Sequence, residues 1–238
     1  MPFLHRIAVP LLLLATPAMA QTPPAAVPPA AVSVTPPTAV PVPPRPIMLP
    51  DYVKLPVMQA AVIATAKTQY DRLPGACPAV SLKPTGQLTV YQALNIGVDG
   101  KPIAGVWSER VTATGCDPAR TLNVLTVNHA DGEPERVALM PGDTHADPLT
   151  QKSALQYVQA IVAHSPVAAS CHQIAFTDTH FDGYDGLPSP EVTDGRDNRP
   201  WRESWIMTAC GSTYSVGLLF TPNAQGTRLS GSNPVKRS

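Results

Sequence analysis

The sequence predicts an α+β fold made of two copies of one unit, each a helix followed by antiparallel strands. The stretches WSERVTATGC and WRESWIMTAC, which begin at Trp107 and Trp201, carry Trp, Glu and Cys at the same spacing and lie 94 residues apart. The same shift superimposes the two cysteine pairs. Because these are rare residue types at fixed spacing, we expect a tandem duplication, with the two units related by a pseudo-twofold axis.

Residues 1–20 have the features of a secretory signal peptide. His5 and Arg6 precede a short apolar run, and Ala18 and Ala20 are the small residues that a signal peptidase reads. The run is too short to cross a membrane as a helix, and no later segment approaches the required length. We expect cleavage after Ala20, no membrane span in the mature chain, and a location in the periplasm or outside the cell.

Residues 21–50 form a Pro-rich segment. Eleven of these thirty residues are proline, and Arg45 carries the only charge. Proline fixes φ and lacks a backbone donor, so we expect neither helix nor sheet here but an extended tether. A passive spacer and a segment that docks to a partner are both compatible with this composition.

The first unit is expected over residues 51–144. Its helix is predicted over 55–73, which is rich in alanine after Pro56. The apolar alternation then predicts one short strand directly after the helix and three further strands, over 77–82, 88–97, 107–116 and 121–127.

The second unit is expected over residues 145–229, followed by a flexible tail over 230–238. Asp147 is placed to cap a helix over 147–164, whose apolar stripe contains Leu155, Val158, Ile161 and Val162. Strands are predicted over 171–176, 201–210 and 212–220, with a long polar loop over 177–200. In the last strand one face is apolar and consists of Tyr214, Val216, Leu218 and Phe220.

The four cysteines predict two disulfides, because exported cysteines in even number normally pair. Four cysteines allow three connectivities. The repeat favours Cys77–Cys116 and Cys171–Cys210, since a duplicated unit must first have folded with its own two cysteines. Pairing of equivalent cysteines across the copies is the alternative. A metal site is disfavoured because the chain has no Cys-x-x-Cys motif.

Glu203 is the candidate catalytic residue. On a strand it shares a face with Trp201 and Trp205, and a carboxylate in apolar surroundings can act as a general acid. The structural alternative is that Glu109 and Glu203 each pair with an arginine or accept bonds from backbone amides. The candidate partners are Arg110, Arg120, Arg199 and Arg202. Because both copies carry the glutamate, the structural interpretation is favoured, with Trp107 and Trp201 as core residues beside the disulfides.

The polar loop over 177–200 holds the candidate metal ligands. It carries six carboxylates against two arginines and begins with an Asp-x-His-x-Asp-Gly pattern similar to the first half of a calcium loop. It departs from that pattern by having His180 at the third position and Ser189 in place of the closing glutamate. A solvated loop is the competing interpretation. The candidates are Asp178, His180, Asp182 and Asp185, with His172 nearby.

Composition and motifs exclude several function classes. Lysine plus arginine and aspartate plus glutamate balance at 17 each, so nothing points to nucleic acid or an anionic membrane surface. The chain has no Gly-x-Ser-x-Gly elbow, no His-Glu-x-x-His motif and no phosphate-binding glycine loop. No cofactor is expected.

The stretch over 201–229 carries Trp-x-Glu-x-Trp, then Cys-Gly, an alternating strand and Gly-Thr. This pattern resembles exported proteins of Gram-negative bacteria whose activity is uncharacterised, which implies an envelope location and no particular activity. The first copy departs from it at Val111 and Asp117. The stretch VDGKPIAGVWSERVTATGCD, residues 98–117, also resembles the C-terminal domain of energy-transducing TonB proteins. That domain follows a Pro-rich segment too, but there a membrane anchor replaces the cleaved signal, and the disulfide repeat is foreign to it.

We therefore expect an exported, non-enzymatic binding or assembly module on a Pro-rich tether, with an unknown envelope protein or ligand as its partner. The alternative is a periplasmic hydrolase or metal-dependent enzyme that uses Glu203 and the acidic loop over 177–200.

Overall fold

The computed structural model describes residues 47–97, 101–130, 133–171, 173–190, 192 and 198–237. The predicted signal peptide, almost all of the Pro-rich segment, Asp99, Gly100 and His172 therefore lie outside the described residues. Within the described part of the chain, no helix combines the length and apolar character needed to cross a membrane.

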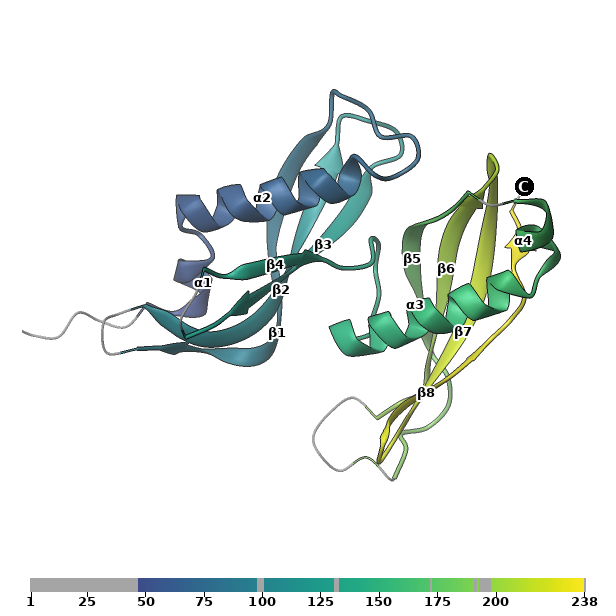
Figure 1. Ribbon diagram of the computed structural model, residues 1–238. Coiled ribbons are helices and arrows are strands. Elements are labelled where there is room, and N and C mark those ends of the chain that lie inside the picture. Colours follow the sequence, from purple (N-terminus) through teal and green to yellow (C-terminus); the bar gives the residue numbers. More distant parts are fainter. Residues whose placement is uncertain are drawn as a thin grey trace, which may run out of the picture. The chain divides into compact units, whose positions relative to one another are not determined.

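The first unit is a four-stranded antiparallel sheet with helices on one face (Figure 1). The strands lie in chain order, so each pairs with its neighbour in sequence. The elements are α1 (Leu49–Tyr52), α2 (Pro56–Tyr70), β1 (Ser81–Ile96), β2 (Pro102–Thr114), β3 (Arg120–Asn128) and β4 (Glu135–Ala138).

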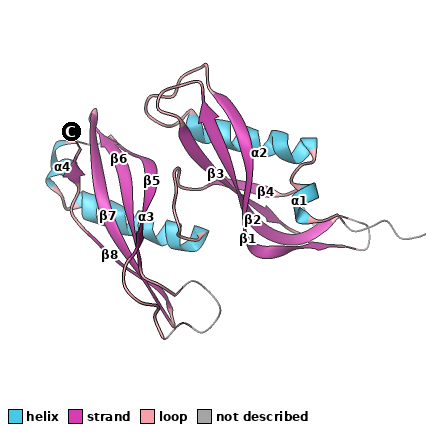
Figure 2. Ribbon diagram, turned by 180° about the vertical axis from the view of Figure 1, so that it is seen from behind, coloured by secondary structure: helices cyan, strands magenta, loops and turns pink. Residues whose placement is uncertain are grey.

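The second unit has the same order of elements, one main helix followed by four antiparallel strands (Figure 2). A short fifth strand pairs with β7 on the same sheet. The elements are α3 (Pro148–Ala163), α4 (Pro166–Ser170), β5 (Ile174–Tyr184), β6 (Trp201–Ala209), β7 (Ser212–Asn223), β8 (Gly226–Gly231) and β9 (Val235–Lys236).

Each main helix buries one stripe against its own sheet. In the first unit Val62 and Ala66 of α2 pack on Val111 and Leu122. In the second unit the helix buries Ala154, Val158 and Val162 against Trp205, Met207 and Val216. The predicted helices and the apolar face of β7 are confirmed. Asp147 caps α3 as expected, because its carboxylate accepts from the amides of Leu149 and Thr150.

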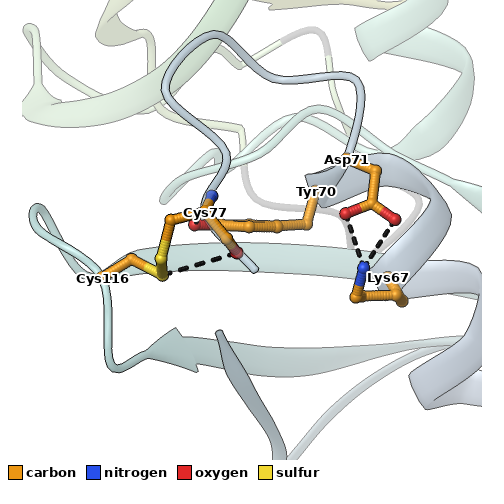
Figure 3. Close-up of a disulfide and its surroundings, with 5 residues drawn as sticks. All are labelled: Lys67, Tyr70, Asp71, Cys77 and Cys116. Atoms are coloured by element: carbon orange, nitrogen blue, oxygen red, sulfur yellow. Dashed lines mark hydrogen bonds and ion pairs between the residues drawn. A yellow bond between two sulfur atoms is a disulfide. The ribbon is translucent and has the colours of Figure 1, made fainter. Parts of the chain in front are cut away.

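The disulfides join Cys77 to Cys116 and Cys171 to Cys210, with Cα atoms 6.2 and 5.7 Å apart, so the predicted connectivity is confirmed. Figure 3 shows how the first bridge is attached to the end of α2. The backbone amide of Cys77 donates to the phenol oxygen of Tyr70 at 3.2 Å, and Tyr70 itself is buried. The bridge therefore ties the helix end to the end of β2.

The strand registers of the β2–β3 pair and the β6–β7 pair are related by the 94-residue offset of the sequence. Glu109 pairs with Val124, and adding 94 to both numbers gives the observed pair of Glu203 with Leu218. The first ladder begins in the same way, since Ser81 with Thr114 becomes Ala175 with Thr208. The ladders differ further along β1 and β5, where the bulges fall at different places.

Four sequence expectations need correction. A helix does form at the end of the Pro-rich segment, because Pro50 lies in the first turn of α1, where its missing N–H costs no hydrogen bond. In the first unit, the separate strands expected over 77–82 and 88–97 are one bulged strand, β1. Residues 177–184, expected as a loop, belong to β5. The expected tail contributes the end of β8 and all of β9.

The segment Leu139–Asp147, which connects β4 to α3, is fixed by hydrogen bonds along its length. The side-chain amide of Asn123 on β3 donates to the carbonyls of Met140 and Gly142 at 2.8 and 2.9 Å. The Asp143 amide donates to the carbonyl of Thr179 on β5, and the Thr179 hydroxyl donates to the carbonyl of Pro141, both at 2.7 Å. This connecting segment is therefore an ordered part of the fold.

Gly142 is the tightest point of the connecting segment and gives the first prediction. Its φ is +96°, and a Cβ there would overlap atoms of Asp178 and Thr179. We expect Gly142→Ala to lower the free energy of unfolding by about 3 kcal/mol, through backbone strain together with displacement of β5. The measurement is urea unfolding. Gly183→Ala is the control, since its φ is +117° but a Cβ there meets no atom within 4 Å. Equal losses in the two variants would contradict the packing argument.

Candidate functional site

The carboxylate of Glu203 is fully buried and accepts hydrogen bonds on both oxygens. Oε1 accepts from the indole N–H of Trp201 at 2.9 Å, and Oε2 accepts from that of Trp205 at 2.9 Å. The remaining bonds come from the connecting segment: the Thr144 hydroxyl, at 2.9 Å from Oε2, and the amides of His145 and Ala146, at 2.8 and 3.2 Å from Oε1. A buried carboxylate bonded in this way has hydrogen-bond donors for both oxygens and needs no arginine to stabilise it.

This environment argues against a catalytic role for Glu203. The side chain is 0% exposed, so it cannot touch a substrate. Its oxygens already accept from five groups, which leaves no free position for a reacting proton. The structural interpretation, in which the glutamate holds backbone amides, fits the geometry, whereas the four arginines proposed as partners are engaged elsewhere. Arg110 pairs with Asp143, Arg202 with Asp185, Arg120 with the Pro74 carbonyl, and Arg199 lies over the Tyr184 ring.

Glu109, the counterpart of Glu203, shares the tryptophan bond but not the backbone donors. The Trp107 indole donates to its Oε1 at 3.1 Å. The positions that correspond to Thr144, His145 and Ala146 are Pro50, Asp51 and Tyr52. Pro50 has no donor, and the amides of Asp51 and Tyr52 both donate to the Met48 carbonyl inside the α1 turn.

The environment of Glu109 changes the pKa of its carboxyl group. Burial raises the pKa of the Glu109 carboxyl above its ordinary value, opposed by the Trp107 hydrogen bond and the positive charge of Arg136. Arg136 was not among the arginines expected from the sequence. Within the described residues, three buried side-chain atoms on the neighbouring strands have no hydrogen-bond partner. They are Thr126 Oγ1, Asn128 Nδ2 and Arg136 Nε. The first unit therefore satisfies its buried polar groups less completely than the second.

Trp107 and Trp201 are core residues, as expected, but the predicted packing beside the disulfide holds for Trp201 and not for Trp107. Trp107 meets the edge of Tyr52, with ring centroids 5.9 Å apart, in a cluster that does not contain Cys116. Trp201 stacks on Phe220 at 4.8 Å and belongs to the same cluster as Cys171. Only the second tryptophan thus shares a core with its disulfide.

His145 is the centre of an aromatic cluster at the surface of the second unit. Its ring centroid lies 5.3 Å from Phe181, 5.5 Å from Tyr184 and 5.2 Å from Trp201. Arg199 extends the cluster, since its guanidinium carbon lies 3.4 Å from the centre of the Tyr184 ring. Because Glu203 also binds the His145 amide, both the backbone and the ring of this exposed residue are held in place.

A cavity of about 450 Å³ lies beside His145. Its walls come from β1, β2, β3, the connecting segment and the first turn of α3. Polar side chains dominate the lining, among them Thr89, Tyr91, Ser108, Arg110, Asp143 and His145. This volume falls within the range of small-molecule sites. The sequence did not point to this cavity, because its residues lie on separate elements and share no motif.

The candidate metal ligands lie on β5 and in the turn that follows it. Asp178 and His180 are 3.3 Å apart, Asp182 accepts from the Ser204 hydroxyl, and Asp185 pairs with Arg202. Among the described residues, no three histidine, cysteine or carboxylate side chains are grouped closely enough to hold a metal ion. The extended strand separates the residues that a calcium loop would bring around one point.

Comparison with protein families, curated proteins and solved structures found no match to this chain.

Replacement of Glu203 tests its structural role. In Glu203→Gln an NH₂ group takes the place of one acceptor oxygen and faces the donors that now bind it. We expect the free energy of unfolding to fall by about 3 kcal/mol, since at least one buried donor loses its partner. Urea unfolding at neutral pH measures the loss, and Glu135→Gln, on an exposed carboxylate, is the control. A loss below about 0.5 kcal/mol, as for an ordinary surface change, would refute the role.

The same replacement at Glu109 is expected to act in the opposite direction. Because the folded protein raises the pKa of Glu109, the neutral acid is favoured by folding. This contribution is complete below the ordinary glutamate pKa of about 4.3 and is lost as pH rises through the higher folded value, with a slope of at most about 1.4 kcal/mol per pH unit. Glu109→Gln should remove that slope and be more stable than the wild type at neutral pH.

The measurement for Glu109→Gln is a series of urea unfolding curves from acid to neutral pH, compared with wild type at each pH. A constant difference between the two proteins across the series would show that Glu109 does not titrate in this way.

Proposed function

We propose that this chain is an exported, non-enzymatic binding module and that the cavity beside His145 is its binding site. The observation that supports this most strongly is the location of Glu203. Glu203, the candidate catalytic residue of the sequence, holds the wall of the cavity through its hydrogen bonds to Thr144, His145 and Ala146. A rigid wall favours binding, because less conformational freedom is lost when the ligand enters.

An exported location is supported by the signal-like residues 1–20 and by the two disulfides, which persist in oxidising compartments. The Pro-rich segment suits a tether that carries the folded units away from an attachment point. Resemblance to exported proteins of Gram-negative bacteria points to the periplasm.

Duplication of one ancestral unit is part of the proposal. It is supported by the equal cysteine separations, by the repeated order of elements and by the 94-residue offset that relates the β2–β3 ladder to the β6–β7 ladder. After duplication the copies took different roles. The first now contributes the sheet surface at Tyr91 and Ser108, and the second contributes the aromatic cluster at His145.

Capture from envelope extract tests the proposal. The chain without residues 1–20 is immobilised and incubated with the extract, and the bound species are identified by mass spectrometry. We expect the wild type to retain a species that Thr89→Trp does not, since an indole on this exposed strand position fills the cavity. Thr227→Trp, on β8 and outside the cavity lining, should retain it.

The same capture separates binding from catalysis. A binding module returns its ligand with unchanged mass. Recovery of hydrolysis fragments would make the protein a hydrolase, and identical capture by Thr89→Trp and wild type would remove the cavity from the proposal.

A further inference from the structure

The charged groups of the cavity beside His145 are already compensated. Arg110 and Asp143 form an ion pair at 2.6 Å. Asp147 accepts from the amides of Leu149 and Thr150 at 2.9 and 3.0 Å, so its charge lies at the positive end of the α3 dipole. A ligand with a net charge would have to break one of these pairs or remain uncompensated, and a neutral ligand meets no such cost.

The remaining lining is rich in neutral hydrogen-bonding groups. Hydroxyls come from Thr89, Tyr91, Ser108 and Thr144, and amides from Gln87 and Gln151. Burial raises the pKa of Tyr91, so its phenol is a neutral donor and acceptor throughout the physiological range. Most small-molecule pockets are lined mainly by apolar side chains, and this one is not. Its lining therefore suits a ligand whose own surface is dense in hydroxyls.

Two of the polar groups are free to bind. Among the described residues, the side chains of Gln87 and Thr89 make no hydrogen bond, although both line the cavity. A primary amide offers one acceptor and two donors, and a hydroxyl can act as either. Paired groups of this kind match the neighbouring hydroxyls of a sugar ring.

The cavity also carries two aromatic rings, Tyr91 and His145. The His145 ring is held by three aromatic neighbours, and Tyr91 lies 3.3 Å from Ser108 through its hydroxyl oxygen. Rigid rings of this kind present an apolar surface at small entropic cost. A sugar has the complementary surface, since its C–H groups lie on the faces of the ring and its hydroxyls at the edge.

We propose that the cavity binds a neutral oligosaccharide. This inference rests on the proposed binding function and specifies its ligand class. The volume of about 450 Å³ accommodates roughly one or two sugar rings. Gln87, Thr89 and Ser108 bind hydroxyls of the ligand, Tyr91 and His145 contact its C–H faces, and the Arg110–Asp143 pair closes one side.

Nuclear magnetic resonance titration of the chain without residues 1–20 tests the ligand class. The probes are maltotriose, triacetylchitotriose and the anionic trigalacturonate. We expect saturable shifts at Tyr91 and Ser108 with at least one neutral trisaccharide, and weaker or no binding of trigalacturonate. Sedimentation with insoluble chitin distinguishes a polymeric glycan from a free oligosaccharide as the source of the ligand. A protein that binds the polymer pellets with the chitin, whereas a protein that binds only free oligosaccharide stays in solution.

Matched variants locate the binding. Gln87→Ala combined with Thr89→Ala removes two unpaired polar groups from an exposed strand and should weaken binding about tenfold, as loss of two neutral hydrogen bonds predicts. Gln225→Ala combined with Thr227→Ala is the control, because it changes the same Gln-x-Thr spacing outside the cavity lining and should leave affinity unchanged.

Three results would overturn the inference. These are preference for trigalacturonate, equal effects of the two double variants, and absence of shifts with all three probes. Each leaves the capture experiment with Thr89→Trp to decide separately whether the cavity binds another class of ligand.

Discussion

Two indole N–H groups, one hydroxyl and two backbone amides converge on the carboxylate of Glu203 inside the second unit. A buried carboxylate is costly unless its oxygens are bonded, and here the donors come from β6 itself and from the segment that enters α3. The interaction therefore fixes where the connecting segment meets the sheet. Asp147, which caps α3, is the next residue after Ala146, whose amide Glu203 binds. The position of the start of α3 therefore depends on the Glu203 carboxylate.

The two Trp-x-Glu motifs show how one sequence pattern can have two energetic outcomes. In both motifs the indole N–H donates to the glutamate two residues later, because residues i and i+2 lie on the same face of a strand. The difference arises outside the motif. Thr144 in the second unit corresponds to Pro50 in the first, and the amides that could follow Pro50 are used within α1. Burial raises the pKa of the Glu109 carboxyl, and the Trp107 hydrogen bond and the charge of Arg136 oppose that rise.

Local patterns predicted the fold where short-range chemistry decides it. The Asp147 cap, the burial of Val158 and Val162 on α3 and the alternation of β7 are set by residues within a few positions of one another. The cysteine pairing could be predicted because the spacing is repeated. The extension of β5 through Tyr184 was missed because Asp and Gly resemble a turn, whereas pairing with β6 buries Thr177 and Thr179 and so favours a strand. Tertiary pairing here outweighed turn propensity.

The candidate site could not be predicted because no stretch of sequence contains it. Tyr91 and His145 are 54 positions apart in the numbering and come together only through the path of the connecting segment. That path depends on Asn123, Gly142 and Glu203, each of which looks unremarkable or misleading in the sequence. Glu203 in particular has the residue type and neighbours of a catalytic acid. Because it is buried and its Oε1 accepts from the His145 amide, the carboxylate beside the indoles holds the backbone of the connecting segment, so residue type and neighbours alone do not identify a catalytic acid.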